Sequence, residues 1–257
     1  MGAARAYVEI EAGYCGVSLT PRWLPPRPLP PTAVEPRRAT PRSLARLVEK
    51  TGSPLAAALA VAAVNAATTA WMLETPGAPP PGYTILRRGD SLPRRLGIES
   101  GDRVALLGYM PGLAEETVRM GADLRAADYD AGLLEEARRR RHAAVDARDR
   151  AAVAEAIRWA TVVVFSGSAV LDPATFLEEA RLARRTGARL VALVGATSSF
   201  HHLVAEKLGV DAVAGLVVEP SLCPRVRASA AAGGGVHRVR GRLVHWLWRR
   251  RLTGQEG

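Results

Sequence analysis

The sequence predicts an α/β protein with a Rossmann-like, doubly wound parallel sheet and a smaller N-terminal α+β domain. Two observations predict the sheet. Its apolar runs are continuous rather than alternating, which is typical of parallel strands covered by helices on both faces. Strand-like and helix-like segments also alternate through the second half of the chain, which predicts right-handed crossover connections.

The clearest such unit lies between Thr161 and Phe200. Val162–Phe165 and Leu190–Val194 are predicted strands, and a helix-length segment separates them. Asp172-Pro173 gives that helix an N-cap and a first-turn proline, and Gly187 follows its last turn. The segment is therefore a β–loop–α–β unit.

The N-terminal domain begins with an expected antiparallel hairpin, Ala6–Glu11 and Tyr14–Leu19, with Gly13 in the turn. Pro21–Pro41 is rich in proline and is expected to be extended loop. A helix is expected from Pro41 through Lys50. Hairpin and helix together give the small α+β domain.

A second N-terminal helix covers Leu55–Leu73, which has no charged residue and is close to the length that spans a bilayer. Its alanine-rich composition, interrupted by Asn65, favours a buried helix in a soluble protein, and we expect no transmembrane segment. Buried alone, the Asn65 amide needs a partner in the backbone, in a ligand or in the other domain. A backbone partner is the commoner outcome for buried amides.

The second domain is expected to hold five strands alternating with helices, and the predicted domains are residues 1–88, 89–222 and 223–257. The remaining strands are expected at Val104–Leu107, Leu124–Ala127 and Asp211–Val218. The remaining helices are expected at Leu113–Met120, Leu133–Ala160 and His201–Leu208.

The C-terminal segment is strongly basic. Of the formal net charge of +10, much lies in Ser221–Gly257, which has eight arginines and one glutamate. Ala228–Gly235 is predicted to be a flexible linker, and His237–Leu252 a basic amphipathic helix. Residues 237–251 could therefore contact a polyanion, either nucleic acid or an anionic membrane surface; an idle tail is the alternative.

Composition also suggests where the protein works. The two cysteines, Cys15 and Cys223, are far apart and form no CxxC motif, so free buried thiols in a reducing cytoplasm are expected. No signal peptide is visible in Met1–Tyr14, which again favours a cytoplasmic protein. A single Asn and a single Gln suit a thermophile; codon bias in a GC-rich genome is a second explanation, and the two are compatible.

Three loops lie where ligands bind in open parallel sheets, at the carboxyl ends of strands. They are Gly108–Gly112, Ser166–Ser168 and Gly195–Ser199, and each combines glycine with small or polar residues. Asp128 ends a strand about twenty residues after the first loop, where a ribose-binding acid would lie. The predicted ligand contacts are Gly108, Tyr109, Asp128, Ser166, Gly167, Ser168, Gly195, Thr197, Ser198 and Asn65. The alternative is that these residues serve only as turn residues and helix caps.

Several motifs of established chemistry are absent from the sequence. It contains no GxGxxG after a strand, no Walker loop, no GxSxG elbow and no zinc-type spacing of cysteine and histidine. A nicotinamide dinucleotide site is therefore not favoured. An S-adenosylmethionine-dependent, methyltransferase-like enzyme remains as an alternative, since Asp128 could contact a ribose.

Six segments, in this order and spacing, resemble a prokaryotic family labelled putative heavy-metal chelation. They are GVSLTP (16–21), ALAVAAVNA (58–66), VALLGYMPG (104–112), VVVFSGSAVLDPAT (162–175), LVALVGATSSF (190–200) and GVDAVAGLVVEP (209–220). The resemblance implies an enolase N-terminal-like domain joined to a Rossmann-like domain, in a soluble cytoplasmic protein with a pocket between the two.

The resemblance and the three loops together predict a binding protein for a small anionic ligand or a metal ion or metal complex. The predicted pocket lies at the carboxyl edge of the sheet and faces the N-terminal domain. The sequence leaves open whether the protein is an enzyme, and whether it forms a homo-oligomer.

Overall fold

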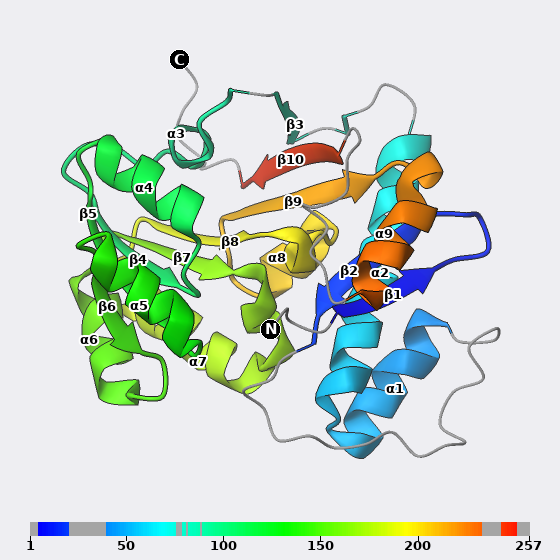
Figure 1. Ribbon diagram of the computed structural model, residues 1–257, viewed down its shortest axis with the longest axis horizontal. Helices are drawn as coiled ribbons and strands as arrows, with labels where there is room; N and C mark the ends of the chain where they lie inside the picture. The colour runs from blue at the N-terminus through cyan, green and yellow to red at the C-terminus, as the bar shows by residue number, and fades with distance from the viewer. Residues whose placement is uncertain are drawn as a thin grey trace. The chain divides into compact units, whose positions relative to one another are not determined.

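The computed structural model describes residues 5–20, 40–75, 79–80, 82–87, 89–232 and 243–250 (Figure 1). The chain divides into two compact units, and neither is one continuous stretch. Unit 1 comprises Met1–Pro80, Gly195–His201 and Gly215–His245. Unit 2 comprises Pro81–Val194, His202–Ala214 and Trp246–Gly257.

Among the described residues, the main sheet has eight strands in the order β3-β10-β9-β8-β7-β4-β5-β6, which confirms the predicted doubly wound α/β fold. The strands are β3 (Tyr83–Leu86), β4 (Arg103–Leu107), β5 (Asp123–Asp128), β6 (Ala143–Asp146), β7 (Val162–Ser166), β8 (Leu190–Val194), β9 (Ala212–Val218) and β10 (Leu243–Arg249). The six strands from β4 to β9 pair in parallel. Their order is that of a Rossmann sheet, in which the chain winds outward from the centre in both directions.

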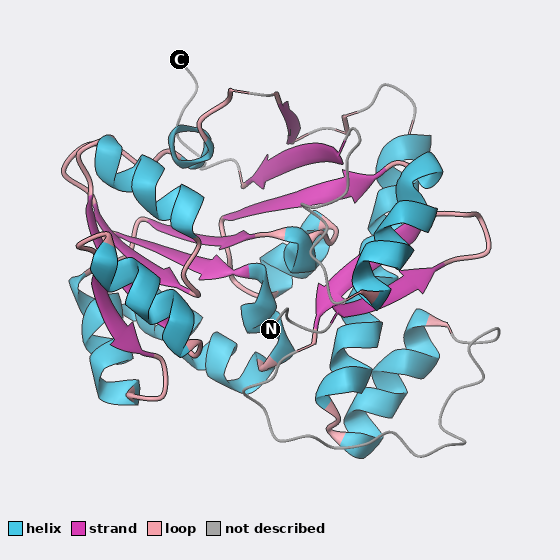
Figure 2. Ribbon diagram, in the orientation of Figure 1, coloured by secondary structure: helices cyan, strands magenta, loops and turns pink. Residues whose placement is uncertain are grey.

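Helices cover both faces of this sheet (Figure 2). They are α3 (Leu92–Leu96), α4 (Pro111–Arg119), α5 (Ala131–Arg139), α6 (Arg150–Trp159), α7 (Pro173–Arg185) and α8 (His202–Lys207). As predicted, the Asp172 side chain caps α7, by accepting the backbone N–H of Thr175. Central strand β7 has four consecutive buried residues, Val162–Phe165, as expected of a strand covered on both faces.

One predicted helix was wrong. Leu133–Ala160 is not continuous, because the edge strand β6 separates α5 from α6. The break comes at Arg141, which adopts a left-handed φ of 60° just after α5. Glycine usually fills such a position, so the sequence did not signal a helix end there.

In unit 1 the predicted hairpin forms from β1 (Arg5–Glu9) and β2 (Cys15–Leu19), which pair antiparallel. It packs against α2 (Pro54–Glu74) and α9 (Cys223–Ala231), and α1 (Pro41–Thr51) packs against α2. Helix α2 approaches β2 so closely that a Cβ on Gly16 would lie 2.1 Å from the carbonyl oxygen of Ala62. The alanine-rich composition of α2 is what permits this close contact.

Among the described helices, α2 alone is long and apolar enough to cross a membrane by length and composition. Its buried residues are Pro54, Ala56, Ala58, Ala62, Ala63, Asn65, Ala66, Thr68, Thr69 and Met72. Half of the apolar window of α2 is buried within the described residues.

The expectation of free thiols was wrong. Cys15 of β2 and Cys223 of α9 form a disulfide across 208 residues of sequence, with their Cα atoms 5.9 Å apart. The two cysteines are far apart in the sequence and form no CxxC motif, so the sequence did not indicate that folding brings them together.

The C-terminal segment also differs from the prediction. Residues 223–231 form α9 where irregular structure was expected, and residues 243–249 form strand β10 where a basic helix was expected. Trp246 and Trp248, which lie in the segment that could contact a polyanion, are buried at 0% and 5% exposure. Residues 233–242 and 251–257 lie outside the described part of the chain. They include the end of the predicted linker and four of the eight tail arginines: Arg238, Arg240, Arg242 and Arg251.

Candidate functional site

The sheet of unit 2 reverses its winding direction at β4. The chain runs from β4 to β5 and β6 on one side, and then returns to place β7 on the other side of β4 (Figure 1). Leu107 of β4 is in register with Ala127 of β5 and Phe165 of β7, so the three carboxyl ends are level. Ligands of open α/β sheets bind outside such a reversal point.

Two predicted residues, Gly108 and Ser166, meet at this point. Gly108 has a φ of 92°, and a Cβ added to it would lie only 2.4 Å from the Ser166 Cβ. Glycine is required there both by its dihedral angle and by the space. The Ser166 hydroxyl lies 3.1 Å from the Ser168 hydroxyl, and both residues are half-buried. Gly167, between them, is buried at the start of the 3₁₀ turn η2 (Gly167–Leu171).

Asp128 fixes the loop that follows β4. Its Oδ2 accepts the backbone N–H of Tyr109 at 2.7 Å, and its Oδ1 accepts that of Asp130 at 2.7 Å. Burial raises the pKa of the Asp128 carboxyl, and these N–H groups act in the opposite direction. A carboxylate offers about four acceptor positions, so Asp128 can still receive a hydrogen bond from a ligand.

Tyr109 contributes its backbone rather than its hydroxyl to this edge. The side chain is buried, and its hydroxyl lies 3.0 Å from Nδ1 of His142. Burial raises the pKa of Tyr109, and burial together with the Arg140 charge lowers the pKa of His142. The pair is therefore neutral near pH 7 and packs as part of the fold.

Helix α4 starts at the reversal point and differs from its neighbours in how it is capped. Asp130, Asp149 and Asp172 cap α5, α6 and α7 through their side chains. The N-cap residue of α4, Met110, makes no side-chain capping bond. Gly112, in the first turn, is exposed, and a Cβ on it would meet no atom within 4 Å. The start of α4 therefore presents backbone N–H groups and a partial positive charge to an open surface.

The predicted contacts of the third loop lie in unit 1, and their polar groups are used within that unit. Thr197 Oγ1 accepts the backbone N–H of Leu19 at 3.2 Å, and the Ser198 hydroxyl donates to the carbonyl oxygen of Gly195 at 2.9 Å. Thr197 and Ser198 are both buried. Gly195 opens this loop with a φ of 134°, which suits glycine. Ligand contact by Gly195, Thr197 and Ser198 stays a prediction beside these internal hydrogen bonds.

Asn65 joins that loop to the hairpin within unit 1. Its Nδ2 lies within hydrogen-bond distance of the carbonyl oxygens of Val17 (2.8 Å), Thr197 (3.1 Å) and Ala196 (3.2 Å). The side chain is 1% exposed, so these backbone partners are the ones its amide nitrogen required. Its Oδ1 has no hydrogen-bond partner among the described residues.

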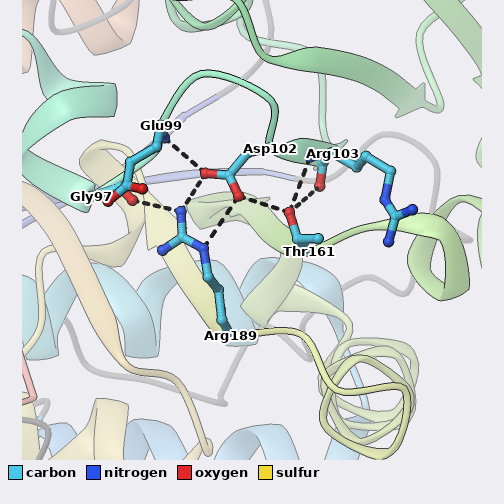
Figure 3. Close-up of polar contacts among 6 residues, drawn as sticks. All are labelled: Gly97, Glu99, Asp102, Arg103, Thr161 and Arg189. Atoms are coloured by element: carbon cyan, nitrogen blue, oxygen red, sulfur yellow. Dashed lines mark hydrogen bonds and ion pairs between the residues drawn. The ribbon is translucent and has the colours of Figure 1, made fainter.

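A second polar cluster, which the sequence did not single out, lies at the opposite, amino ends of β4, β7 and β8 (Figure 3). Asp102 accepts hydrogen bonds from the Thr161 hydroxyl at 2.9 Å, from the Glu99 backbone N–H at 2.7 Å and from the Arg189 guanidinium. Arg189 also donates to the carbonyl oxygen of Gly97 at 2.7 Å. Since ligands bind at the other edge of such sheets, this cluster ties strand ends together.

The carboxyl edge does not provide side chains suited to a bare metal ion. Within the described ranges, no group of three or more histidine, cysteine, aspartate or glutamate residues could hold an ion. Asp128, the carboxylate nearest the reversal point, already accepts backbone N–H groups with both oxygens. Backbone N–H groups, hydroxyls and glycine instead suit an anion, including a metal that is carried inside an anionic complex.

Two family models match the chain, and both are described as putative heavy-metal chelation. One matches residues 1–68 and the other residues 92–249. Two solved structures of proteins of unknown function, each assigned to the family of the second model, are similar over 97% of this chain.

The structure from Pyrococcus horikoshii has a TM-score of 0.68 and 14% identity, with 89% of its chain covered. That from Desulfitobacterium hafniense DCB-2 has a TM-score of 0.66 and 16% identity, with 90% covered. At such identities the likeness concerns the fold. A search of curated proteins gave no match.

Proposed function

Because the chain belongs to the family described as putative heavy-metal chelation, we propose that it binds a small anionic ligand or an anionic metal complex at the carboxyl edge of its parallel sheet. The site would lie in unit 2, where the loops after β4, β5 and β7 meet. The observation that carries the proposal is the start of α4, which lacks a side-chain cap at the point where the strand order reverses.

Each residue would have a separate part in binding. The N–H groups at the start of α4 would hold the negative charge, and Gly108 would let the ligand approach the backbone. The Ser166 and Ser168 hydroxyls, which already lie 3.1 Å apart, would donate to ligand oxygens. Asp128 would accept from a hydroxyl or N–H of the ligand while it keeps the Tyr109 loop in place. A metal would enter as part of the ligand, with its coordination filled by the complex.

Substitution at Gly112 offers a direct test, because the position is exposed, open and free of a positive φ. Gly112→Glu should place a carboxylate beside the first turn of α4, where it competes with an anionic ligand and leaves the fold intact. Gly112→Gln has nearly the same size without the charge. Calorimetric titration with inorganic pyrophosphate, as a simple anionic probe, should show binding to the wild type and the Gln variant, and much weaker binding to the Glu variant.

Equal affinity of the Glu and Gln variants would show that the anion binds elsewhere. Raising the salt concentration should weaken binding to the wild type, because the attraction is partly electrostatic.

A methyltransferase-like enzyme remains the second candidate, favoured by the place of Asp128 at the end of β5. In Rossmann sheets an acid at that strand end contacts a ribose hydroxyl. Calorimetric titration with S-adenosylmethionine distinguishes the two proposals. Binding that Asp128→Asn abolishes would support this candidate, and no binding at millimolar concentration would remove it.

A further inference from the structure

The chain's two cysteines, Cys15 and Cys223, are brought together inside unit 1. They come from β2 and from the start of α9, and they are 0% and 2% exposed. Thiolate is the protein ligand that soft metals prefer, and only these two residues can supply it in this sequence. We propose that the reduced Cys15–Cys223 pair is a buried, two-coordinate site for a soft divalent cation such as Hg(II).

The surroundings of the two cysteines favour a metal complex without net charge. The buried hydrophobic cluster around the pair consists of Val17, Leu216, Val218, Leu222 and Val226; the half-buried Tyr7 packs against it, with its hydroxyl 3.4 Å from the Cys223 carbonyl oxygen. A net charge is expensive to bury among such residues. Two thiolates and one divalent cation form a neutral complex, whereas two thiolates with a monovalent Cu(I) or Ag(I) would leave a negative charge.

The pair offers only two ligands, which is too few for a structural zinc ion. Structural zinc takes four protein ligands, and the described residues offer no cluster of three or more cysteine, histidine or carboxylate groups. A linear ion needs only two ligands. Two metal–thiolate bonds of about 2.3 Å in a line span about 4.6 Å. This span is shorter than the 5.9 Å between the two Cα atoms, so rotation of the cysteine side chains can part the sulfurs enough.

The disulfide itself cannot bind the ion, because the ligand is the thiolate. A dithiol reductant would supply two electrons and two protons, break the S–S bond, leave two thiols and become a disulfide itself. The cation would then replace both thiol protons, so that one ion enters and two protons leave. The oxidation state of the two cysteines would therefore decide whether the chain can hold the metal.

This site is separate from the carboxyl-edge site, since none of its ligands belongs to the loops after β4, β5 and β7. The two proposals can therefore fail independently. The Gly112→Glu variant should bind Hg(II) as the wild type does, and a Cys15→Ala/Cys223→Ala variant should bind pyrophosphate as the wild type does.

The test is a titration of full-length protein with Hg(II), after reduction and removal of the reductant without oxygen. Near-ultraviolet thiolate-to-metal absorption and native mass spectrometry would measure binding, and thermal unfolding would show that the reduced chain remains folded. We expect one Hg(II) per reduced chain, none retained by the oxidised chain or the double variant, and no zinc retained by any form.

Three results would overturn the proposal. They are two mercury ions per reduced chain, unchanged binding by the double variant, or reduced protein without a cooperative thermal transition, since the site would then belong to an unfolded chain. The single variants Cys15→Ala and Cys223→Ala keep one thiol each. They should lose the charge-transfer absorption of the two-thiolate complex and leave the mercury removable by a competing monothiol.

Discussion

Asn65 holds three backbone carbonyls of unit 1 with one side chain, and its place in α2 makes it hard to replace. In Asn65→Ala the carbonyl oxygens of Val17, Ala196 and Thr197 would lose that partner in a buried environment. We expect the free energy of unfolding to fall by about 3 kcal/mol, the effect of leaving buried acceptors unsatisfied. Chemical denaturation would measure the change.

Thr68→Ala is the matched control, because Thr68 is buried in the same helix but its hydroxyl donates only within that helix, to the Val64 carbonyl oxygen. We expect Thr68→Ala to lower the free energy of unfolding by about 1 kcal/mol or less. Similar losses for the two variants would mean that the Asn65 contacts add little beyond burial.

Arg141 shows how a backbone dihedral angle can be tested. Its φ of 60° is the left-handed conformation that costs an L-residue roughly 1–2 kcal/mol and costs glycine little. Arg141→Gly should therefore raise the free energy of unfolding by about 0.5–1 kcal/mol. Arg141→Ala removes the same charge but keeps the left-handed strain. If both variants raised the free energy of unfolding equally, the cause would be the lost charge and not the backbone conformation.

At the residue scale, the sequence showed that certain polar side chains need hydrogen-bond partners, but it did not show which groups those partners are. A buried Asn65 was expected to need a partner; its amide nitrogen finds backbone carbonyls, while its Oδ1 has no partner among the described residues. The hydroxyls of Thr197 and Ser198 were predicted to contact a ligand; they bond to Leu19 and Gly195, and a ligand contact stays a prediction. Short hydroxyl side chains suit ligands and turns equally well, so composition alone cannot separate the two roles.

At the scale of elements, β10 carries a prediction that separates a sheet strand from a polyanion-binding tail. Trp246 is fully buried in β10, and its Nε1 has no hydrogen-bond partner in the described ranges. Trp246→Ala should lower the free energy of unfolding by about 3–5 kcal/mol through loss of buried surface. Trp246→Phe should cost much less, since it keeps an aromatic ring and removes the unsatisfied N–H. A stability unchanged by Trp246→Ala would place the residue outside the fold.

The Asp102 cluster at the amino ends of the strands predicts a pH dependence. Burial alone would raise the pKa of Asp102, but Arg189, the Glu99 N–H and the Thr161 hydroxyl together hold that pKa below its ordinary value. A lowered folded-state pKa means that the stabilisation is complete above the unfolded value of about 4 and is lost as pH falls through the folded value. Asp102→Asn should cost about 2 kcal/mol at pH 7 and progressively less below about pH 4.

Denaturation curves across that pH range would measure the difference between Asp102→Asn and wild type. Glu155→Gln is the control, because Glu155 is 74% exposed where it pairs with Arg125, and such pairs contribute less than about 1 kcal/mol. A difference between Asp102→Asn and wild type that stayed constant down to pH 2 would contradict the account.

Element prediction succeeded where the apolar pattern was long and failed where it was short. Strands β4, β5, β7, β8 and β9 were predicted from their apolar runs. Strand β6 is four residues, AAVD, none of them fully buried, so it gives no such signal. A short run such as Leu243–Arg249 suits a buried strand as well as a helix, and the strand formed because tertiary packing decides such cases.

For the whole molecule, sequence order does not show which distant segments meet. Each compact unit is assembled from three separated stretches of chain, and a disulfide joins residues 208 positions apart within unit 1. Periodicity reports local structure, so it predicted the α/β class and the loops at the strand ends but not this long-range pairing. The family models, which match residues 1–68 and 92–249, supply the remaining constraint on function.

The central claim is that the carboxyl edge of unit 2 holds an anionic small molecule or metal complex. Native mass spectrometry with elemental analysis, on gently purified wild type, Gly112→Gln and Gly112→Glu, tests it most directly. We expect a retained small-molecule mass, with or without a stoichiometric metal, in the first two proteins and its loss from the third. A bare chain in all three, or the same mass retained by Gly112→Glu, would contradict the claim.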